Sequence, residues 1–298
     1  MYSIIIPTLN NLEYLKLCIK SIRKNSKFNN HEIIPHVNIG TDGTLEYLKS
    51  ENINYTFTKE NSGICKGMNL AAKESTLDYI LYAHDDFYFC PEWDLILKNE
   101  IDKIGHNNFY LSGTMVNNGQ IEFYCGDNIK NFNEKEFLNN HKKYNHYDFQ
   151  GSTWSPHLIH RDIWNKVQGL SEEYYPGTGS DPDLNMKLWK EGVRIFKGIN
   201  DFKVYHFGSI VTRKYKNHPT IKTESGSRGA KIFLLKWGIT IGFFKKNILN
   251  SDTRYEGELV NPRKSLKFFA QLLLCKINYL YVKYIYNINN KHKLTNKN

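Results

Sequence analysis

Short apolar runs alternate with stretches of helical periodicity over the first hundred residues, and this alternation is the strongest constraint on the fold. The apolar runs are rich in branched or aromatic residues, as buried strands are, and they cover residues 3–6, 32–37, 55–57 and 79–83. Helical periodicity fills the intervals at residues 12–22, 43–48 and 63–73. Strands separated by single helices indicate a parallel sheet, so we predict an α/β fold.

Ligands of such sheets bind beyond the carboxyl ends of the strands, so polar residues in those places are candidates for chemistry. Asp85 and Asp86 directly follow the fourth strand, where two adjacent carboxylates are costly unless a cation or donors neutralise them. Their oxygens suit Mg²⁺ or Mn²⁺ on a diphosphate, although a solvated acidic turn has the same sequence. His84 and His206, each near a strand end, are either further metal ligands or hydrogen-bonded structural residues.

Two turns between strands and helices are weaker candidates. Asn61 and Gly63 precede a predicted helix that carries Lys66 in its first turn. Free N–H groups at a helix start attract anions, so a phosphate site and an ordinary capped helix are both open. Asp42, after the second strand, is either a base or ribose contact or the cap of the next helix.

Asp181 and Asp183 flank Pro182 at the start of a well-marked helix that ends before Gly192. A carboxylate beside a substrate can take a proton from an attacking hydroxyl. Asp181 also fits the N-cap position, where the helix dipole would keep it ionised and lower its basicity. Trp154 precedes this helix in the chain, and its ring is suited to stacking on a sugar or to packing in the core.

Taken in order, these segments resemble glycosyltransferase family 2. The segments that carry the resemblance are residues 3–10 (SIIIPTLN), 41–44 (TDGT), 61–63 (NSG), 84–86 (HDD), 180–184 (SDPDL) and 204–206 (VYH). The resemblance covers about residues 1–210. It implies a GT-A fold, with a Rossmann-like, mostly parallel sheet flanked by helices. It also implies a nucleotide-diphosphate sugar donor, a divalent cation and inversion at the anomeric carbon.

The resemblance implies a role for each matching residue. Asp181 becomes the expected general base, and Asp86 and His206 the expected ligands of Mn²⁺ or Mg²⁺. Trp154 and Asp183 are the expected acceptor contacts. The expected nucleotide-sugar contacts are Pro7, Thr8, Asn38, Asp42, Asn61, Gly63, Lys66, Asp85, Arg228 and Lys231.

Four positions depart from the family pattern. Asn38 stands where the first acid after the second strand is usual, and Gly40 stands where the family has Ser. His84 replaces the first acid of the D-x-D motif, and Ser180 replaces a Glu. Metal binding would then rest on Asp86, His206 and phosphate oxygens. A catalytically degenerate sugar-nucleotide-binding partner subunit is therefore a second hypothesis.

The rest of the chain is basic. The formal net charge is +10, from 40 Lys and Arg against 30 Asp and Glu, and residues 213–246 mix cations with aromatics. We predict a nucleotide-sugar half at about 1–105, an acceptor half at about 106–210, and a basic closing segment with a C-terminal amphipathic helix at 211–298. Nucleic acid is a possible anionic partner by charge alone, but no recognition motif is present, so none is expected.

The helix predicted at residues 265–286 carries Lys267, Lys276 and Lys283 among apolar residues. It either lies on an acidic membrane, where a lipid-linked acceptor would be found, or docks on the catalytic domain or a dimer partner. Five cysteines without C-x-x-C spacing indicate a reduced protein without structural zinc. With no visible secretory signal or spanning segment, the expected location is cytoplasmic, with peripheral attachment at the inner face of a membrane as an option.

These observations converge on one predicted function. We expect an inverting, metal-dependent hexosyltransferase that takes its sugar from a nucleotide-diphosphate sugar, with UDP-sugars favoured. The acceptor is expected to be a hydroxyl of a glycan or of a lipid-linked molecule. The sequence leaves the donor sugar, the linkage and the oligomeric state open.

Overall fold

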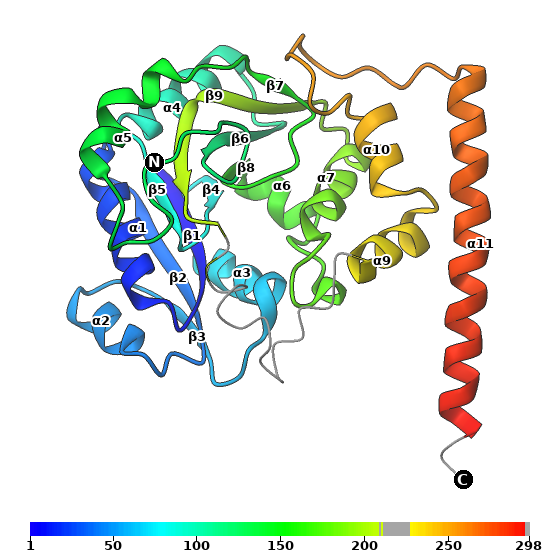
Figure 1. The fold of residues 1–298 in the computed structure, drawn as a ribbon, viewed down its shortest axis with the longest axis horizontal. Helices are drawn as coiled ribbons and strands as arrows, with labels where there is room; N and C mark the ends of the chain where they lie inside the picture. Colours follow the sequence, from blue (N-terminus) through cyan, green and yellow to red (C-terminus); the bar gives the residue numbers. More distant parts are fainter. Residues whose placement is uncertain (209, 211–226, 296–298) are drawn as a thin grey trace.

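A nine-stranded sheet forms the centre of the molecule (Figure 1). The computed structural model describes residues 1–208, 210 and 227–295. Along the sheet the strand order is β3-β2-β1-β4-β8-β6-β9-β5, and β7 pairs with β9. The first four of these strands run parallel, and β6 runs parallel to β9. Strands β5, β7 and β8 are antiparallel to their neighbours, so the predicted α/β class is confirmed.

The parallel part of the sheet is built where the periodicity predicted it. Its elements are β1 (Tyr2–Leu9), α1 (Leu12–Asn25), β2 (Glu32–Asn38), α2 (Thr44–Ser50), β3 (Thr56–Thr58), α3 (Gly63–Lys73) and β4 (Tyr79–Tyr82). Strand β1 lies between β2 and β4 and is buried along almost its whole length. Because all these strands run the same way, the loops after β1, β2 and β4 meet at one edge of the sheet.

The second half contains more regular structure than its sequence suggested. Its elements are β5 (Phe87–Phe89), α4 (Trp93–Ile104), β6 (Phe109–Val116), α5 (Glu134–Asn140), η1 (His141–Lys143), β7 (Phe149–Gln150), β8 (His157–His160), α6 (Arg161–Lys166), η2 (Glu172–Tyr174), α7 (Ser180–Lys190) and β9 (Ile195–His206). Residues 109–151 show little periodicity and suggest loops with short antiparallel strands, and residues 194–196 and 203–205 suggest two separate strands. The structure instead has the long strands β6 and β9 in these places. Strand β6 is covered on both faces and so lacks alternation, and β9 stays continuous by shifting its register on β6.

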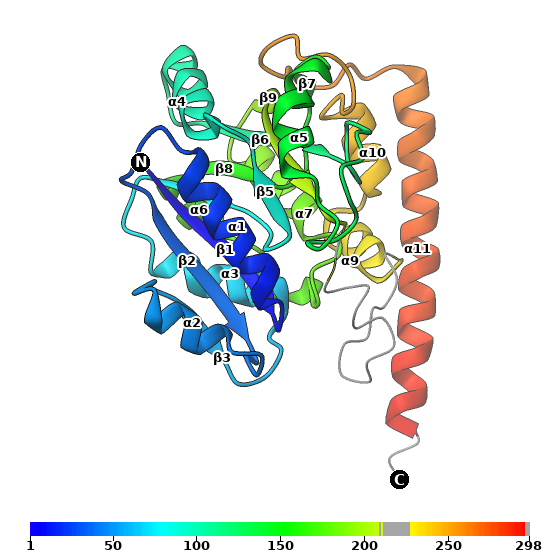
Figure 2. The ribbon, with the colours of Figure 1, turned by 60° about the vertical axis from the view of Figure 1, so that its left-hand side comes forward.

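Three helices follow the sheet within residues 227–295: α9 (Ser227–Trp237), α10 (Ile241–Asn247) and α11 (Leu266–Thr295). Figures 1 and 2 show α9 and α10 beside α7, with α11 along the outer edge of the molecule. The predicted C-terminal helix is confirmed and extends further than expected. Residues 211–226, which include the first part of the predicted basic segment, lie outside the described residues. No helix among those described is both long enough and apolar enough to cross a membrane.

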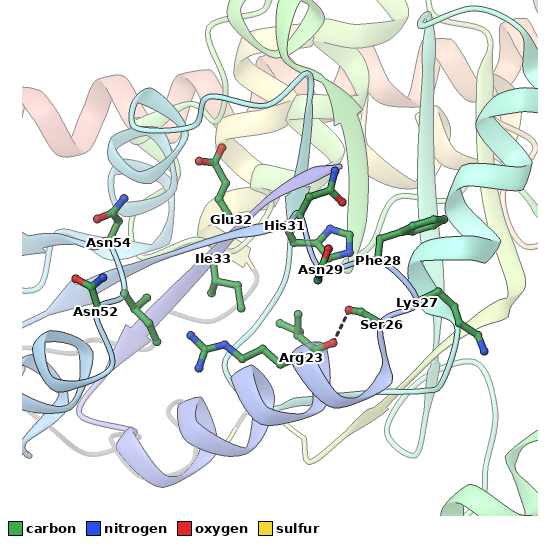
Figure 3. A pocket seen from close by; sticks show the side chains of 13 residues that line it. Arg23, Ser26, Lys27, Phe28, Asn29, His31, Glu32, Ile33, Asn52 and Asn54 are labelled. Atoms are coloured by element: carbon green, nitrogen blue, oxygen red, sulfur yellow. Dashed lines mark hydrogen bonds between the residues drawn. The ribbon is translucent and has the colours of Figure 1, made fainter.

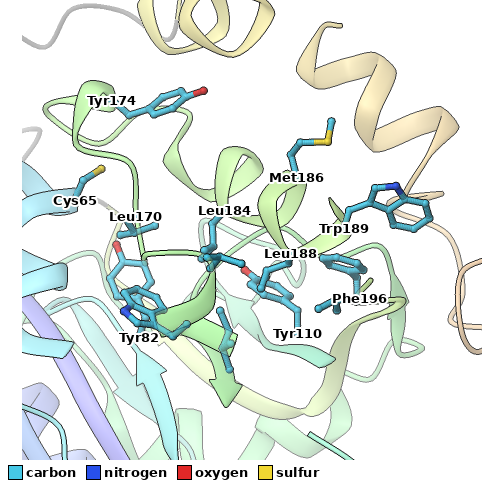
Figure 4. Packing of buried hydrophobic residues seen from close by; sticks show 14 of the residues in the cluster. Cys65, Tyr82, Tyr110, Leu170, Tyr174, Leu184, Met186, Leu188, Trp189 and Phe196 are labelled. Atoms are coloured by element: carbon cyan, nitrogen blue, oxygen red, sulfur yellow. The ribbon is translucent and has the colours of Figure 1, made fainter. Parts of the chain in front are cut away.

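One hydrophobic cluster joins the sheet to α7 and to the C-terminal helices. Figure 4 shows Tyr82 and Tyr110 of the sheet beneath Leu184 of α7, and Phe233 of α9 belongs to the same cluster. Trp189 is only 9% exposed, and the Arg194 guanidinium carbon lies 3.8 Å from its ring centre. This tryptophan therefore packs in the core. All five cysteines are buried and carry no disulfide.

Candidate functional site

Three metal-binding side chains meet beyond the carboxyl end of β4. His84 and Asp86 lie between β4 and β5, and His206 ends β9. Antiparallel pairing of β5 with β9 sets Phe87 opposite His206 and so brings the distant histidine to the acidic turn. One ligand atom from each of the three residues lies within 4.8 Å of the other two, and His206 Nε2 is 3.6 Å from Asp86 Oδ2. We call these three residues the His-Asp-His cluster.

Hydrogen bonds orient both histidines of the cluster. His206 Nδ1 lies 3.1 Å from the backbone oxygen of Asn118, which can only accept, so Nδ1 donates and Nε2 is the nitrogen of this ring that faces Asp86. His84 Nε2 lies 3.0 Å from the Tyr82 hydroxyl and 3.1 Å from Ser155 Oγ. Burial lowers the pKa of His84 to about 4, so its ring is neutral near pH 7, which is the form that binds metals.

The donor set of the cluster has a chemical preference. Two imidazoles and one carboxylate suit Mn²⁺ and other first-row divalent ions, whereas Mg²⁺ favours oxygen ligands throughout. His84 stands where the family pattern has an acidic ligand, and the sequence left it open as a metal ligand or a structural residue. In the structure His84 lies with Asp86 and His206 and is a third candidate ligand.

Asp85 sits in a buried group of unpartnered polar atoms next to the cluster. Its Oδ2 accepts no hydrogen bond from any described residue, and neither Thr8 Oγ1 nor Asn11 Nδ2 has a partner there. Burial, and then the negative charge of Asp86, raise the pKa of Asp85. The nearby side chains of Thr8 and Asn11 act in the opposite direction and favour its charged form. Each unmet buried group costs about 1–3 kcal/mol, so three together indicate a site that a polar ligand completes.

Asp181 stands free at the start of α7. The N-cap of this helix is Gly179, with φ of 89°, so the predicted capping role of Asp181 is wrong. The carboxylate is partly exposed and accepts no hydrogen bond from a described residue. Burial raises its pKa to about 7, in place of the expected lowering by the helix dipole. Its charge acts on the hydroxyls of Tyr82 and Tyr110, and the Tyr82 hydroxyl lies 3.0 Å from His84 Nε2.

Asp183 is fully buried, and its carboxylate accepts hydrogen bonds from other parts of the protein. Its carboxylate accepts hydrogen bonds from Ser171 Oγ at 2.5 Å, Trp237 Nε1 at 2.8 Å and the Tyr174 hydroxyl at 3.2 Å. The Lys236 ammonium lies 3.0 Å from Oδ1. Since the donors come from α9 and from the segment around η2, Asp183 anchors α9 to α7. We assign it this anchoring role in place of the expected acceptor contact.

Helix α9 begins against the turn that precedes α7. A Cβ on Gly229 would lie 2.0 Å from the backbone oxygen of Thr178, so the close approach requires glycine. Arg228 donates a hydrogen bond to the backbone oxygen of Tyr175, and Lys231 is exposed one turn further on. Both cations thus lie on a helix that starts beside the Asp181 segment.

Two of the residues predicted to contact the nucleotide are occupied within the protein. Asn38 Oδ1 accepts from Ser62 at 2.7 Å (backbone N) and 2.9 Å (Oγ), which ties β2 to the loop before α3. Asp42 accepts from the backbone N of Leu12 at 2.8 Å and from Thr44 Oγ1 at 2.6 Å. Asp42 therefore ties the starts of α1 and α2 together, but the N-cap of α2 is Gly43, so Asp42 is not the helix cap that the sequence offered as an alternative.

The start of α3 is also covered. The backbone N of Gly63 donates to Asn61 Oδ1 at 3.0 Å, and the backbone N of Ile64 donates to the oxygen of Pro176 at 2.9 Å. These two backbone amides already have acceptors within the protein and do not offer their N–H groups to a phosphate. The start of α3 therefore fits the reading as an ordinary helix start better than the phosphate site. Lys66 remains exposed on the same helix.

Pro7 and Trp154 lie at the edges of the site. Pro7 is partly exposed near the end of β1, directly before the buried Thr8. Trp154 is partly buried, donates from Nε1 to the backbone oxygen of Gly113 at 2.7 Å, and precedes Ser155, which contacts His84. Its indole N–H thus already has an acceptor, and its ring packs edge-on against Phe149, with the ring centroids 5.6 Å apart.

A separate surface pocket lies at the other end of the sheet (Figure 3). It is bounded by the end of α1, the start of β2 and the segment before β3. Arg23, His31 and Glu32 are among its lining residues. Because this pocket lies at the amino ends of parallel strands, it is remote from the His-Asp-His cluster, and we do not assign it to the donor.

Residues 3–163 match the model of the family described as glycosyl transferase family 2. The chain belongs to glycosyltransferase family 2. The match spans the strands and loops that carry His84 and Asp86 but ends before α7 and β9. No curated protein matches the chain.

Solved structures of S. aureus TarS share the fold of this glycosyltransferase. The structure of TarS 1-349 in complex with UDP has a TM-score of 0.51 and 17% identity, and the match covers 68% of this chain and 59% of that one. A structure of TarS has a TM-score of 0.56 and 16% identity, and the match covers 93% of this chain and 43% of that one. The complex of TarS 1-349 with UDP-GlcNAc has a TM-score of 0.54 and 14% identity, and the match covers 94% of this chain and 72% of that one.

The likeness to TarS confirms the predicted GT-A fold. At 14–17% identity it establishes the fold alone. The chain spans 59% of the first of these structures and 43% of the second, so the activities of those longer proteins are not transferred with the fold.

Proposed function

We propose that the protein is an inverting glycosyltransferase that moves a hexosyl group from a nucleotide-diphosphate sugar to a hydroxyl of a glycan or a lipid-linked acceptor. One observation supports the proposal: Asp181, a carboxylate with a raised pKa and no hydrogen bond to a described residue, acts by its charge on the Tyr82 hydroxyl, which contacts His84 of the His-Asp-His cluster. Residues 1–210 would form the catalytic part, with the segment from 211 closing over it.

The donor is proposed to be a UDP-sugar. Family membership favours a nucleotide sugar, and two of the similar TarS structures are described as complexes with UDP and with UDP-GlcNAc. On this chain, Thr8, Asn11 and Asp85 offer unpartnered buried polar atoms to such a ligand. Arg228 and Lys231 are proposed to supply positive charge to its diphosphate.

A divalent metal ion fits the residues present, because the cluster supplies two imidazoles and one carboxylate and Asp85 Oδ2 lacks a donor. His84, Asp86 and His206 would hold it. When bound, a divalent cation offsets negative charge on a departing diphosphate. Mn²⁺ is the proposed ion on the grounds of ligand type.

Asp181 is proposed to act as the general base. Its ionised carboxylate takes the proton of the acceptor hydroxyl while the acceptor oxygen bonds to the anomeric carbon. The bond between that carbon and the diphosphate oxygen breaks at the same time, and its electron pair leaves with the nucleoside diphosphate. Attack from the face opposite the leaving group inverts the anomeric centre. The partly buried position of Asp181 keeps its basicity high enough for this role near neutral pH.

The test is nucleotide release in the presence of Mn²⁺ and a panel of UDP-, GDP- and TDP-sugars with candidate acceptors. Asp181→Asn should reduce turnover by about 10²–10⁴-fold, the usual contribution of a general base, while donor binding persists in calorimetry. Asp78→Asn, an exposed acid before β4, is the matched control and should leave turnover unchanged. Donor binding without turnover by the unaltered protein would instead favour the non-catalytic partner hypothesis.

The proposed setting is cytoplasmic, with the acceptor presented either in solution or at a membrane. This part of the proposal rests on the sequence, since the cysteines carry no disulfide and the lysine-rich C-terminal helix suits an anionic surface.

A further inference from the structure

Helix α11 has two apolar faces, and its inner face is covered. The rings of Phe268 on α11 and Phe243 on α10 lie 5.1 Å apart, and Cys275 is 3% exposed. Leu272 packs against the main hydrophobic cluster. Figures 1 and 2 show this helix beside α9 and α10. Docking on the catalytic domain, one of the alternatives left by the sequence, therefore accounts for the inner face.

The outer face of α11 is exposed and apolar. Nine of the thirteen large apolar side chains that are exposed among the described residues lie on this helix. Leu273, Ile277 and Leu280 are 58%, 53% and 65% exposed. At 100° per residue, one face opposite Cys275 gathers Leu266, Phe269, Leu273, Leu274, Ile277, Leu280, Tyr281 and Tyr284. An exposed apolar patch of this extent indicates an interaction surface.

Lysines flank the outer face. The same helical spacing puts Lys267 at one edge and Lys276 and Lys283 at the other. Glu258 is the last acidic residue of the sequence, and eight Lys and Arg residues follow it. An apolar face bordered by long cationic side chains, with aromatic residues among the apolar ones, is the pattern of a helix that lies in a lipid interface.

We propose that the outer face of α11 docks on the surface of an anionic lipid bilayer, with the helix lying in the plane of the interface. The apolar side chains would enter the acyl boundary while Lys267, Lys276 and Lys283 reach the headgroups. The helix is 30 residues long, or about 45 Å, so the contact is extended.

Charge decides between the bilayer and a second copy of this chain. Two helices paired along their outer faces would bring their flanking lysines together, and no acidic residue on either helix would offset the repulsion. An anionic surface offers the missing charge. The inner face cannot provide an alternative site, since α9 and α10 already cover it. This inference is independent of which sugar the enzyme transfers.

Co-sedimentation of the full chain with vesicles tests the proposal. Vesicles of phosphatidylcholine alone are compared with vesicles that also contain phosphatidylglycerol, at low and high salt. Binding should require the anionic lipid and weaken with salt. Because each lysine near the surface contributes about fivefold in affinity, the triple change K267Q/K276Q/K283Q should weaken binding about a hundredfold. The control K73Q/K103Q/K130Q removes the same charge from exposed lysines elsewhere and should bind as the unaltered chain does.

A second variant tests the apolar contribution. L273S/I277S/L280S changes only exposed side chains, so its thermal unfolding should match the unaltered protein while its vesicle binding falls at least tenfold. Absence of binding to anionic vesicles would overturn the proposal, as would equal binding by the two lysine variants. The chain could instead form a concentration-dependent dimer, lose that dimer in L273S/I277S/L280S, and show no binding to vesicles. That result would overturn the proposal and assign the outer face to a second copy of the chain.

Discussion

Replacing Asp183 should loosen the attachment of α9 more than any exposed substitution. This carboxylate is 0% exposed and takes donors from Ser171, Tyr174, Lys236 and Trp237. Asp183→Ala leaves the Trp237 indole N–H and the Tyr174 hydroxyl without their acceptor, and it removes one of two carboxylates from Lys236, which keeps Glu173 at 2.9 Å. A buried donor that loses its acceptor costs about 1–3 kcal/mol, so we expect the free energy of unfolding to fall by about 2–4 kcal/mol.

Asp183→Asn should lower the free energy of unfolding by less than Asp183→Ala does. An amide oxygen can still accept from Trp237 Nε1, and the Ser171 hydroxyl can turn to accept from the new NH₂ group. The main loss is the charge that Lys236 pairs with, worth about 1.5–3 kcal/mol for hydrogen bonds to charged groups. Urea unfolding followed by circular dichroism measures both variants. Asp162→Ala, at an 85% exposed side chain, is the control and should stay within about 0.5 kcal/mol.

A double-mutant cycle isolates the anchor. In the unaltered protein Trp237→Phe removes one donor from Asp183 and should cost about 1–2 kcal/mol. In the Asp183→Ala background the same change should cost almost nothing, because the acceptor is already gone. Equal costs in the two backgrounds would refute the anchoring argument. A loss below about 1 kcal/mol for Asp183→Ala would refute it as well.

Three further predictions concern the site and the helix beside it. With a base whose pKa is about 7 and which acts in its ionised form, kcat/KM should rise about tenfold per pH unit up to pH 7 and then level off; a flat profile from pH 5 to 8 would exclude Asp181 from this role. His84→Gln should lower Mn²⁺ affinity in calorimetry about tenfold or more, whereas His106→Gln, on the surface, should not change it; equal affinities would remove His84 from the ligand set. Gly229→Ala should destabilise by about 1–3 kcal/mol, since its Cβ would meet backbone at 2.0 Å, while Gly242→Ala, with open space around it, should be neutral or stabilising; the reverse order would contradict the packing of α9.

The parallel half of the fold could be predicted because its signals are local. Strand β1 and helix α1 carry their periodicity within a few residues of sequence, and right-handed crossovers leave few ways to assemble such units. The order of the polar loops then placed Asp85 and Asp86 at the functional edge. Strand β6 escaped prediction because burial on both faces removes the alternation by which a strand is recognised.

The roles of the acidic residues near α7 depended on contacts that sequence order does not contain. Asp181 and Asp183 are two residues apart, yet one is free with a raised pKa and the other is enclosed by four donors. The difference arises because the helix turns their side chains to different surroundings, and α9, from far along the chain, covers only one of them.

What the sequence determined by itself was the α/β class, the family resemblance, the edge of the sheet that carries the chemistry, and a basic C-terminal helix. Only the tertiary structure decided that His84 joins Asp86 and His206, because the pairing of β5 with β9 brings them together. It also decided which face of α11 is covered and which is left open. Periodicity and residue type are local properties of a chain, whereas ligand sets, pKa values and exposed faces are set by neighbours that folding brings from elsewhere.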